Sequence, residues 1–145
     1  MRKILLLLLP LAALGFAPAP VFREKPSDPD AVLRRLQGGW RGVSCKKGGR
    51  SLFIGIPFRT QLDKDHWRSY YGKPPRQTIS LTIAIDTKSE PMRIDWRGEG
   101  VHIKGIFSLS GDKLRYVYSP PNMGYPQSLT APAPEDYFFE LDREK

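Results

Sequence analysis

The chain has little cysteine and little histidine. Of its 145 residues, one is cysteine, Cys45, and two are histidine, His66 and His102. A single cysteine excludes an internal disulfide, so the fold must be held by buried apolar side chains. Because Cys45 stands beside Val43 and Ser44 in an expected strand, the favoured interpretation is a buried, inert thiol, with pairing to another molecule as the alternative.

Two histidines also limit the metal and catalytic chemistry. A metal site would need His66 and His102 to meet with a carboxylate, and no recognised ligand spacing supports one. Lys64, between Asp63 and Asp65, would weaken such a site. A nucleophilic cysteine or serine would need a histidine and an acid beside it, and the sequence offers only the ingredients. We therefore predict no catalytic residue, no metal ligand and no cofactor.

Acidic residues are scarce as well. Fifteen Asp and Glu stand against 23 Lys and Arg, which gives a formal net charge of +8. A basic surface favours anionic partners. No nucleic-acid-binding module is recognised, and an exported protein meets anionic polymers of the cell envelope rather than genomes, so nucleic acid is a disfavoured partner.

No apolar run is long enough to span a bilayer comfortably. Arg2 and Lys3 precede a short apolar run that ends in small residues, which predicts a secretory signal peptide over residues 1–15 with Ala13 and Gly15 at the cleavage site. An uncleaved membrane anchor is the alternative. Residues 16–26, rich in Ala and Pro, predict a linker, and residues 27–145 a single domain. We expect an exported monomer, periplasmic or extracellular, without a transmembrane anchor after cleavage.

The strongest structural signal lies in residues 77–119. Apolar and polar side chains alternate over residues 78–86, 92–97, 101–110 and 114–118, and short turns join these segments. A period of two predicts successive antiparallel strands, each with one buried face. Ile106 breaks the alternation of its segment.

The flanking segments complete the expected fold. A helix over residues 29–36 has Ser27 or Asp28 as its N-cap, and its apolar face, Val32, Leu33 and Leu36, is expected against the sheet or across one end. Further strands are expected over residues 40–46, 51–58, 65–71 and 137–141, and a loop with five prolines over residues 119–135. We predict an all-β, antiparallel up-and-down, lipocalin-like barrel of about eight strands with one short N-terminal helix.

Three segments carry a family resemblance: LQGGW at 36–40, IDTKSEPMRID at 85–95 and KGIFSLSGDKL at 104–114. Together they resemble the uncharacterised domain family abundant in planctomycete bacteria, with its LQGxW, LDPTKxPKxID and GIYxLxGDxLxxC motifs. The likeness covers residues 36–143 and implies an exported, lipocalin-like domain with no established activity. The chain departs from the family pattern at Val117, where a cysteine is frequent, and at Tyr125-Pro126, where Arg-Pro is usual.

The motif residues themselves are interpreted as structural. Gly38, Gly105 and Gly111 meet backbone needs, and Asp86 and Asp95 are expected at strand boundaries. These two acids, with Glu90 and Glu99, lie near turns, and nothing marks them as a catalytic acid pair.

Two segments are candidate ligand or partner surfaces. Aromatic and cationic residues are interleaved after His66, and such residues can stack on a ligand and contact its anionic groups. The proline-rich loop adds two further residues, which would flank the mouth of a barrel. The candidate surface residues are Trp67, Arg68, Tyr70, Tyr71, Met123 and Tyr125. The alternatives are that Trp67 and Tyr71 cap the core while Arg68 snorkels, and that the loop is a solvated connection.

Three functions remain open from the sequence. The leading hypothesis is a binding protein that holds a small apolar ligand inside the barrel, without chemistry of its own. The second is an interaction module with a filled barrel, which binds an envelope protein or an anionic polymer. The third and weakest is a cell-envelope hydrolase.

Overall fold

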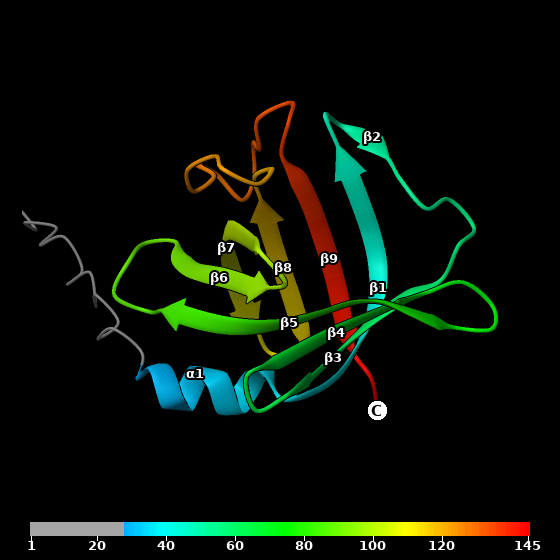
Figure 1. Ribbon diagram of the computed structural model, residues 1–145, viewed down its shortest axis with the longest axis horizontal. Helices are drawn as coiled ribbons and strands as arrows, with labels where there is room; N and C mark the ends of the chain where they lie inside the picture. The colour runs from blue at the N-terminus through cyan, green and yellow to red at the C-terminus, as the bar shows by residue number, and fades with distance from the viewer. Residues whose placement is uncertain (1–27) are drawn as a thin grey trace, which may run out of the picture.

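The structure is a computed structural model that describes residues 28–145, which form a closed antiparallel barrel with one short helix (Figure 1). The elements are α1 (Pro29–Leu36), β1 (Gly38–Lys47), β2 (Arg50–Ser51), β3 (Phe58–Asp63), β4 (His66–Tyr71), β5 (Arg76–Asp86), β6 (Met92–Gly98), β7 (Val101–Ser110), β8 (Lys113–Tyr118) and β9 (Tyr137–Arg143). The sheet order is β1-β3-β4-β5-β6-β7-β8-β9, and β9 returns to pair with β1. β2 pairs only with the end of β1. The predicted up-and-down barrel of about eight strands is confirmed.

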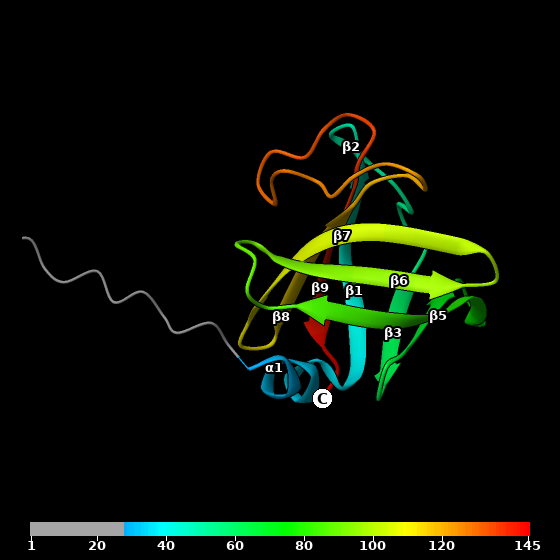
Figure 2. The same cartoon turned by 60° about the vertical axis from the view of Figure 1, so that its left-hand side comes forward.

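Helix α1 lies across one end of the barrel (Figures 1 and 2). Asp28 caps it by accepting a hydrogen bond from the backbone N–H of Asp30 at 3.3 Å. Val32 and Leu36 are buried, as their shared face predicts. The helix ends where Gly38 adopts a φ of +100°, a conformation that a side chain would disfavour.

Trp40 ties this end of the barrel together. Its indole N–H donates to the carbonyl of Leu36 at 2.8 Å, and its ring lies 4.2 Å from the guanidinium carbon of Arg143. Arg143 also donates to the carbonyls of Gln37 and Arg35, which closes the C-terminal end of α1. The LQGGW segment and the last strand therefore contact each other through Trp40, Gln37 and Arg143.

Aromatic side chains fill the barrel interior. The Trp67 and Trp96 rings pack edge to face with centroids 5.5 Å apart, and the Tyr116 and Phe139 rings stack at 4.8 Å. The other large interior residues are Phe58, Tyr71, Ile83, Ile94, Phe107, Leu114, Tyr118 and Leu141. A cavity of only about 40 Å³ remains between them.

The expected strand over residues 51–58 is wrong. β2 ends at Ser51, Phe53 has a φ of +55°, and the N–H of Ile56 donates to the carbonyl of Phe53, so the segment is a turn. Gly55 and Pro57 explain the failure, because both disfavour an interior strand position. The strand that the sequence missed, β3, follows immediately from Phe58.

The four central strands, β5 to β8, form as expected, with two deviations at their ends. Ile79 and Val101 stand on the apolar sides of their alternating segments, yet they are 37% and 39% exposed. Asp86 ends β5, as predicted, where it accepts from Ser89 and the Lys88 N–H. The boundary assignment of Asp95 is wrong, since this residue lies inside β6.

The predicted signal peptide, residues 1–15, and linker, residues 16–26, lie outside the described residues. From Asp28 to the C-terminus, no helix is long and apolar enough to cross a membrane.

Candidate functional site

A loop covers part of the outer wall of the barrel. Ile106 and Val117 point outward from β7 and β8, yet they are only 2% and 0% exposed and lie outside the interior cluster. Residues 119–136, the long loop between β8 and β9, lie on this side (Figure 2). We use "outer wall" for the outward-facing residues of β6 to β9 and β1 together with this loop.

Hydrogen bonds fix the base of the loop. Ser119 Oγ donates to Asp136 Oδ1 at 2.9 Å, and both residues are buried. The other carboxylate oxygen of Asp136 accepts from the Ala133 N–H at 3.2 Å. The two ends of the loop are therefore joined by one satisfied carboxylate, so its placement is defined despite its irregular backbone.

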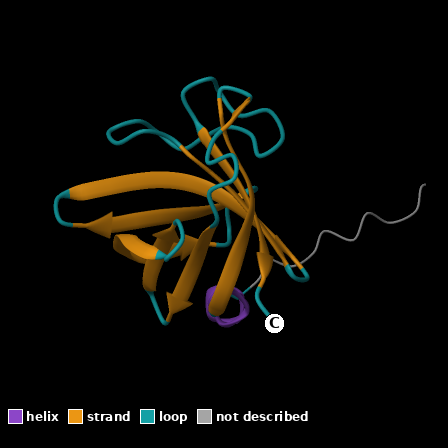
Figure 3. Cartoon of the chain, turned by 90° about the vertical axis from the view of Figure 1, so that its right-hand side faces the viewer, coloured by secondary structure: helices purple, strands orange, loops and turns teal. Residues whose placement is uncertain are grey.

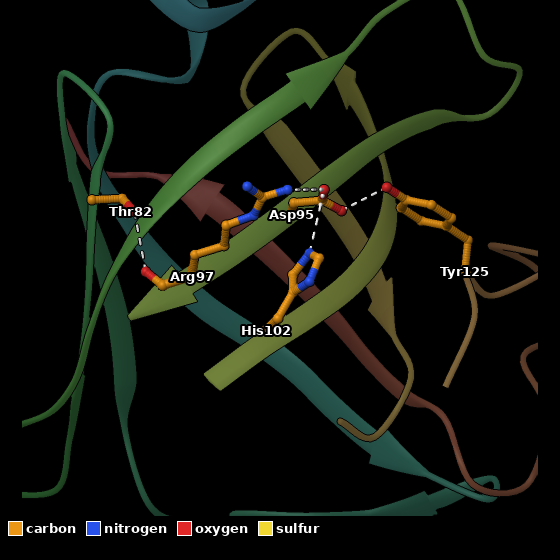
Figure 4. Close-up of polar contacts among 5 residues, drawn as sticks. All are labelled: Thr82, Asp95, Arg97, His102 and Tyr125. Atoms are coloured by element: carbon orange, nitrogen blue, oxygen red, sulfur yellow. Dashed lines mark hydrogen bonds and ion pairs between the residues drawn. The ribbon is translucent and has the colours of Figure 1, made fainter. Parts of the chain in front are cut away.

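Asp95 fixes the middle of the loop (Figure 4). The Tyr125 hydroxyl donates to Asp95 Oδ1 at 2.6 Å, while Arg97 Nη2 and His102 Nε2 each lie 3.4 Å from Asp95 Oδ2. The Asp95 side chain is 15% exposed. Strand pairing brings these groups together, because Arg97 is two residues along β6 and lies opposite His102 on β7.

Cations also flank the ring of Tyr125. The guanidinium carbon of Arg93 lies 4.5 Å from the ring centroid and Lys104 Nζ lies 5.4 Å from it. Desolvation, with the hydrogen bond to Asp95, raises the pKa of Tyr125 to about 12. Tyr125 therefore stays a neutral hydrogen-bond donor throughout the physiological range.

The balance of charge in this cluster is positive. Arg93, Arg97 and Lys104 outnumber the two carboxylates nearby, which are Asp95 and, opposite Arg93 on β5, Asp86. Arg93 and Arg97 are exposed, so they can meet an external anion.

A cleft of about 670 Å³ continues the outer wall on the other side of the loop. Lys46 of β1 and Arg115 of β8 supply its cations, and Phe138 and Leu129 supply apolar surface. Its one acidic strand residue, Glu140, already accepts from Arg115 Nε at 2.7 Å. Asp136 also lines the cleft, where its carboxylate accepts from Ser119 and from the Ala133 N–H, so two cations and two acids face this space.

The structure distributes the six predicted surface residues over three places. Trp67 and Tyr71 point into the barrel, and Trp67 is 3% exposed. Arg68 and Tyr70 face outward on β4, where Arg59 lies 5.6 Å from the ring of Tyr70.

The remaining two surface residues are on the long loop. Met123 is 44% exposed, and Tyr125 belongs to the Asp95 cluster. Of the six, the structure brings only Tyr125 into the outer wall's charged cluster; Trp67 and Tyr71 occupy the core-capping positions of the alternative interpretation.

In the described part of the chain, the two histidines and the cysteine that a metal or catalytic site would use lie in separate places. His66 lies 3.6 Å from Asp65, and His102 is with Asp95 instead. No group of three or more His, Cys, Asp or Glu suited to a metal occurs among residues 28–145. Burial raises the pKa of the Cys45 thiol to about 12, which keeps it protonated.

Comparisons with protein-family models, with curated proteins and with solved structures find no match for this chain. What the structure supports of the resemblance is the antiparallel eight-stranded barrel.

Sequence reasoning missed most of the charged cluster, namely Arg93, Asp95, Arg97, His102 and Lys104. Alternating charges on a strand are usually just solvated, so these residues carried no signal of their own. One signal was present: Ile106 and Val117 place apolar side chains on outward-facing positions of neighbouring strands. Such a pair indicates that something covers the wall at that point.

Proposed function

We propose that this protein is an exported, non-catalytic binding module that holds an anionic polymer of the cell envelope against its outer wall. The observation that carries the proposal is the contrast between a filled interior, with about 40 Å³ free, and an outer cleft of about 670 Å³. Ligand sites for small molecules occupy roughly 300–1,000 Å³. The interior is therefore too small for the apolar ligand of the leading sequence hypothesis, and the interaction-module hypothesis is favoured.

The charges of the outer wall support an anionic partner. Asp95 lies 3.4 Å from Arg97 and Glu140 lies 2.7 Å from Arg115, so neighbouring guanidinium groups offset the charges of these two acids. The exposed guanidinium groups of Arg93 and Arg97 have donors to spare, and guanidinium groups bind carboxylates and phosphates in paired geometry.

The environment of the Cys45 thiol supports a role without catalysis. Cys45 is 2% exposed, and its raised pKa opposes formation of the reactive thiolate. Export rests on the predicted signal peptide, and the likeness of three motifs to the planctomycete domain family fits an exported barrel.

The proposal is tested by titrating the protein with two soluble probes, polyphosphate and poly-glutamate, and measuring affinity by isothermal titration calorimetry. Two double variants remove equal charge from different places. Arg93→Gln with Lys104→Gln changes the outer wall, while Arg34→Gln with Lys64→Gln changes exposed cations of α1 and of the turn between β3 and β4. We expect the wall variant to weaken binding about tenfold or more and the control to weaken it less than about twofold.

Equal losses in the two variants would show that only the overall charge attracts the polymers. That result, or a failure of both probes to bind the unaltered protein at low salt, would overturn the proposal. Thermal unfolding of each variant, which should match the parent within a few degrees, separates lost binding from lost folding.

A further inference from the structure

An exposed apolar loop follows β2. Residues 52–57, with the sequence Leu-Phe-Ile-Gly-Ile-Pro, contain no polar side chain. Ile54 is 82% exposed, Ile56 is 48% exposed and Phe53 is 38% exposed. Soluble surfaces expose single apolar residues routinely, but three within four positions at the tip of one loop form a contiguous patch.

The loop is held in a defined shape. The N–H of Ile56 donates to the carbonyl of Phe53 at 2.9 Å, and the N–H of Gly72 donates to the carbonyl of Pro57 at 2.9 Å. The ring of Phe53 packs on Tyr71 with centroids 4.8 Å apart. The base of the loop is thus anchored on the barrel rim and on the turn after β4, while the isoleucines project. Figure 3 shows large loops at the end of the barrel opposite α1.

Cations surround the loop. Lys73 lines the same groove of about 470 Å³ as Ile54 and Ile56, and Arg50 stands in β2, two residues before the loop begins. Neither of the two chain segments that build this region, residues 44–62 and 66–85, contains an acid. Among residues 28–145, Arg50 and Lys73 form no ion pair, so both charges are available to an external anion.

We propose that residues 52–57 insert into the surface of an anionic lipid bilayer, with Arg50 and Lys73 at the level of the lipid phosphates. An apolar tip with a collar of cations is the arrangement that binds such an interface, because buried apolar area and attraction to anionic headgroups add. A second copy of this chain fits the patch poorly, since it would bring an equally basic surface against these cations. Residues 52–57 line the groove of about 470 Å³ and not the cleft of about 670 Å³, so variants of this loop test the inference apart from the polymer site.

The first experiment measures co-sedimentation with vesicles. Phosphatidylcholine vesicles with and without phosphatidylglycerol are compared, using the processed chain and, as controls, its variants. We expect binding to the anionic vesicles only, and a loss of affinity of about tenfold in Ile54→Ser with Ile56→Ser. Arg50→Gln with Lys73→Gln should lose about fivefold for each cation, whereas the matched pair Arg34→Gln with Lys64→Gln should lose much less.

A second experiment locates the insertion. In Ile54→Trp the new indole should shift its emission to the blue on binding and be quenched by lipids brominated in the acyl chain. In Val101→Trp, which places an indole at another exposed apolar position, neither change should occur. This readout also separates the loop from any contribution of the N-terminal residues.

Three results would overturn the inference: equal binding of parent and Ile54→Ser with Ile56→Ser, quenching of the Val101→Trp indole to the same degree as Ile54→Trp, or dimers that dissociate only in the isoleucine variant. The last would assign the patch to a second copy. If Arg93→Gln with Lys104→Gln binds the polymers as tightly as the parent does, and the parent still binds anionic vesicles, the polymer proposal is refuted and the membrane inference stands.

Discussion

Replacing Tyr125 by Phe tests the contact that places the long loop on the outer wall. The substitution keeps the ring between Arg93 and Lys104 and removes only the hydroxyl, which donates to Asp95 at 2.6 Å. Hydrogen bonds to charged groups contribute about 1.5–3 kcal/mol. Because Asp95 is 15% exposed and keeps Arg97 and His102 nearby, we expect the lower end, a loss of about 1.5 kcal/mol.

Urea unfolding at neutral pH measures this loss, and a double-mutant cycle with Asp95→Asn isolates the coupling between the two side chains. Hydrogen exchange should also accelerate at amides of residues 119–136 while it stays unchanged in β3 and β4. A loss below about 0.3 kcal/mol, or no coupling in the cycle, would refute the account of how the loop is held.

The same variant has a defined pH dependence. The folded state raises the pKa of Tyr125 to about 12 from an ordinary value of 10.0, so it binds the phenolic proton more tightly than the unfolded chain. The stabilisation is therefore complete below about pH 10 and is lost as the pH rises toward 12. The difference between parent and Tyr125→Phe should shrink over that range. Tyr71 and Cys45, whose pKa values are also raised, are present in both proteins and cancel in the difference.

Three further predictions concern the barrel. A Cβ at Gly105 would lie 2.6 Å from Trp96 and from the Val117 carbonyl, so Gly105→Ala should lower the free energy of unfolding in urea by about 2 kcal/mol or more. A Cβ at Gly124 would have no atom within 4 Å, so Gly124→Ala is the matched control and should be nearly neutral. Cys45 should resist thiol reagents at pH 8 in the folded protein and react fully in urea; fast reaction of the native protein would show that the thiol is accessible. Trp40→Phe removes the donor to Leu36 and opens space at the base of a fully buried site, so it should cost about 2–4 kcal/mol; a loss below about 1 kcal/mol would show that this closure is dispensable.

The sequence predicted those elements whose local signals agree. Helix α1 has an N-cap at Asp28, an apolar face and a glycine stop, and it forms over the expected residues. β6 alternates throughout and β8 alternates except at Val117, and both form as expected. Barrel closure followed because eight successive antiparallel strands leave two edges that pair with each other.

The segment after β1 shows where local patterns mislead. Leu52, Ile54 and Ile56 alternate as a strand would, yet no partner strand covers them and Gly55 takes a φ of +73°. In β3, by contrast, Thr60 occupies an inward position between Phe58 and Leu62, so the strand carries a weak apolar signal although all three are buried. Burial depends on the neighbouring strands, and a single segment does not contain that information.

The contacts of the outer wall could not be predicted from local sequence patterns, for a different reason. Tyr125 and Asp95 are 30 residues apart, and the loop that carries Tyr125 has no periodicity. The break in alternation at Ile106 marked the covered strand but not the segment that covers it. Contacts between an irregular loop and a sheet face depend on the folded arrangement of both.

The central claim is that this barrel binds its partner outside rather than inside, and a titration followed by NMR tests it most directly. Amide and indole shifts of the protein are recorded while polyphosphate is added. The account predicts saturable shifts at Arg93, Lys104, Arg115 and Tyr125, with the buried indoles of Trp67 and Trp96 unchanged. Shifts concentrated at those two indoles and at Tyr118 would place the ligand in the interior and contradict the account.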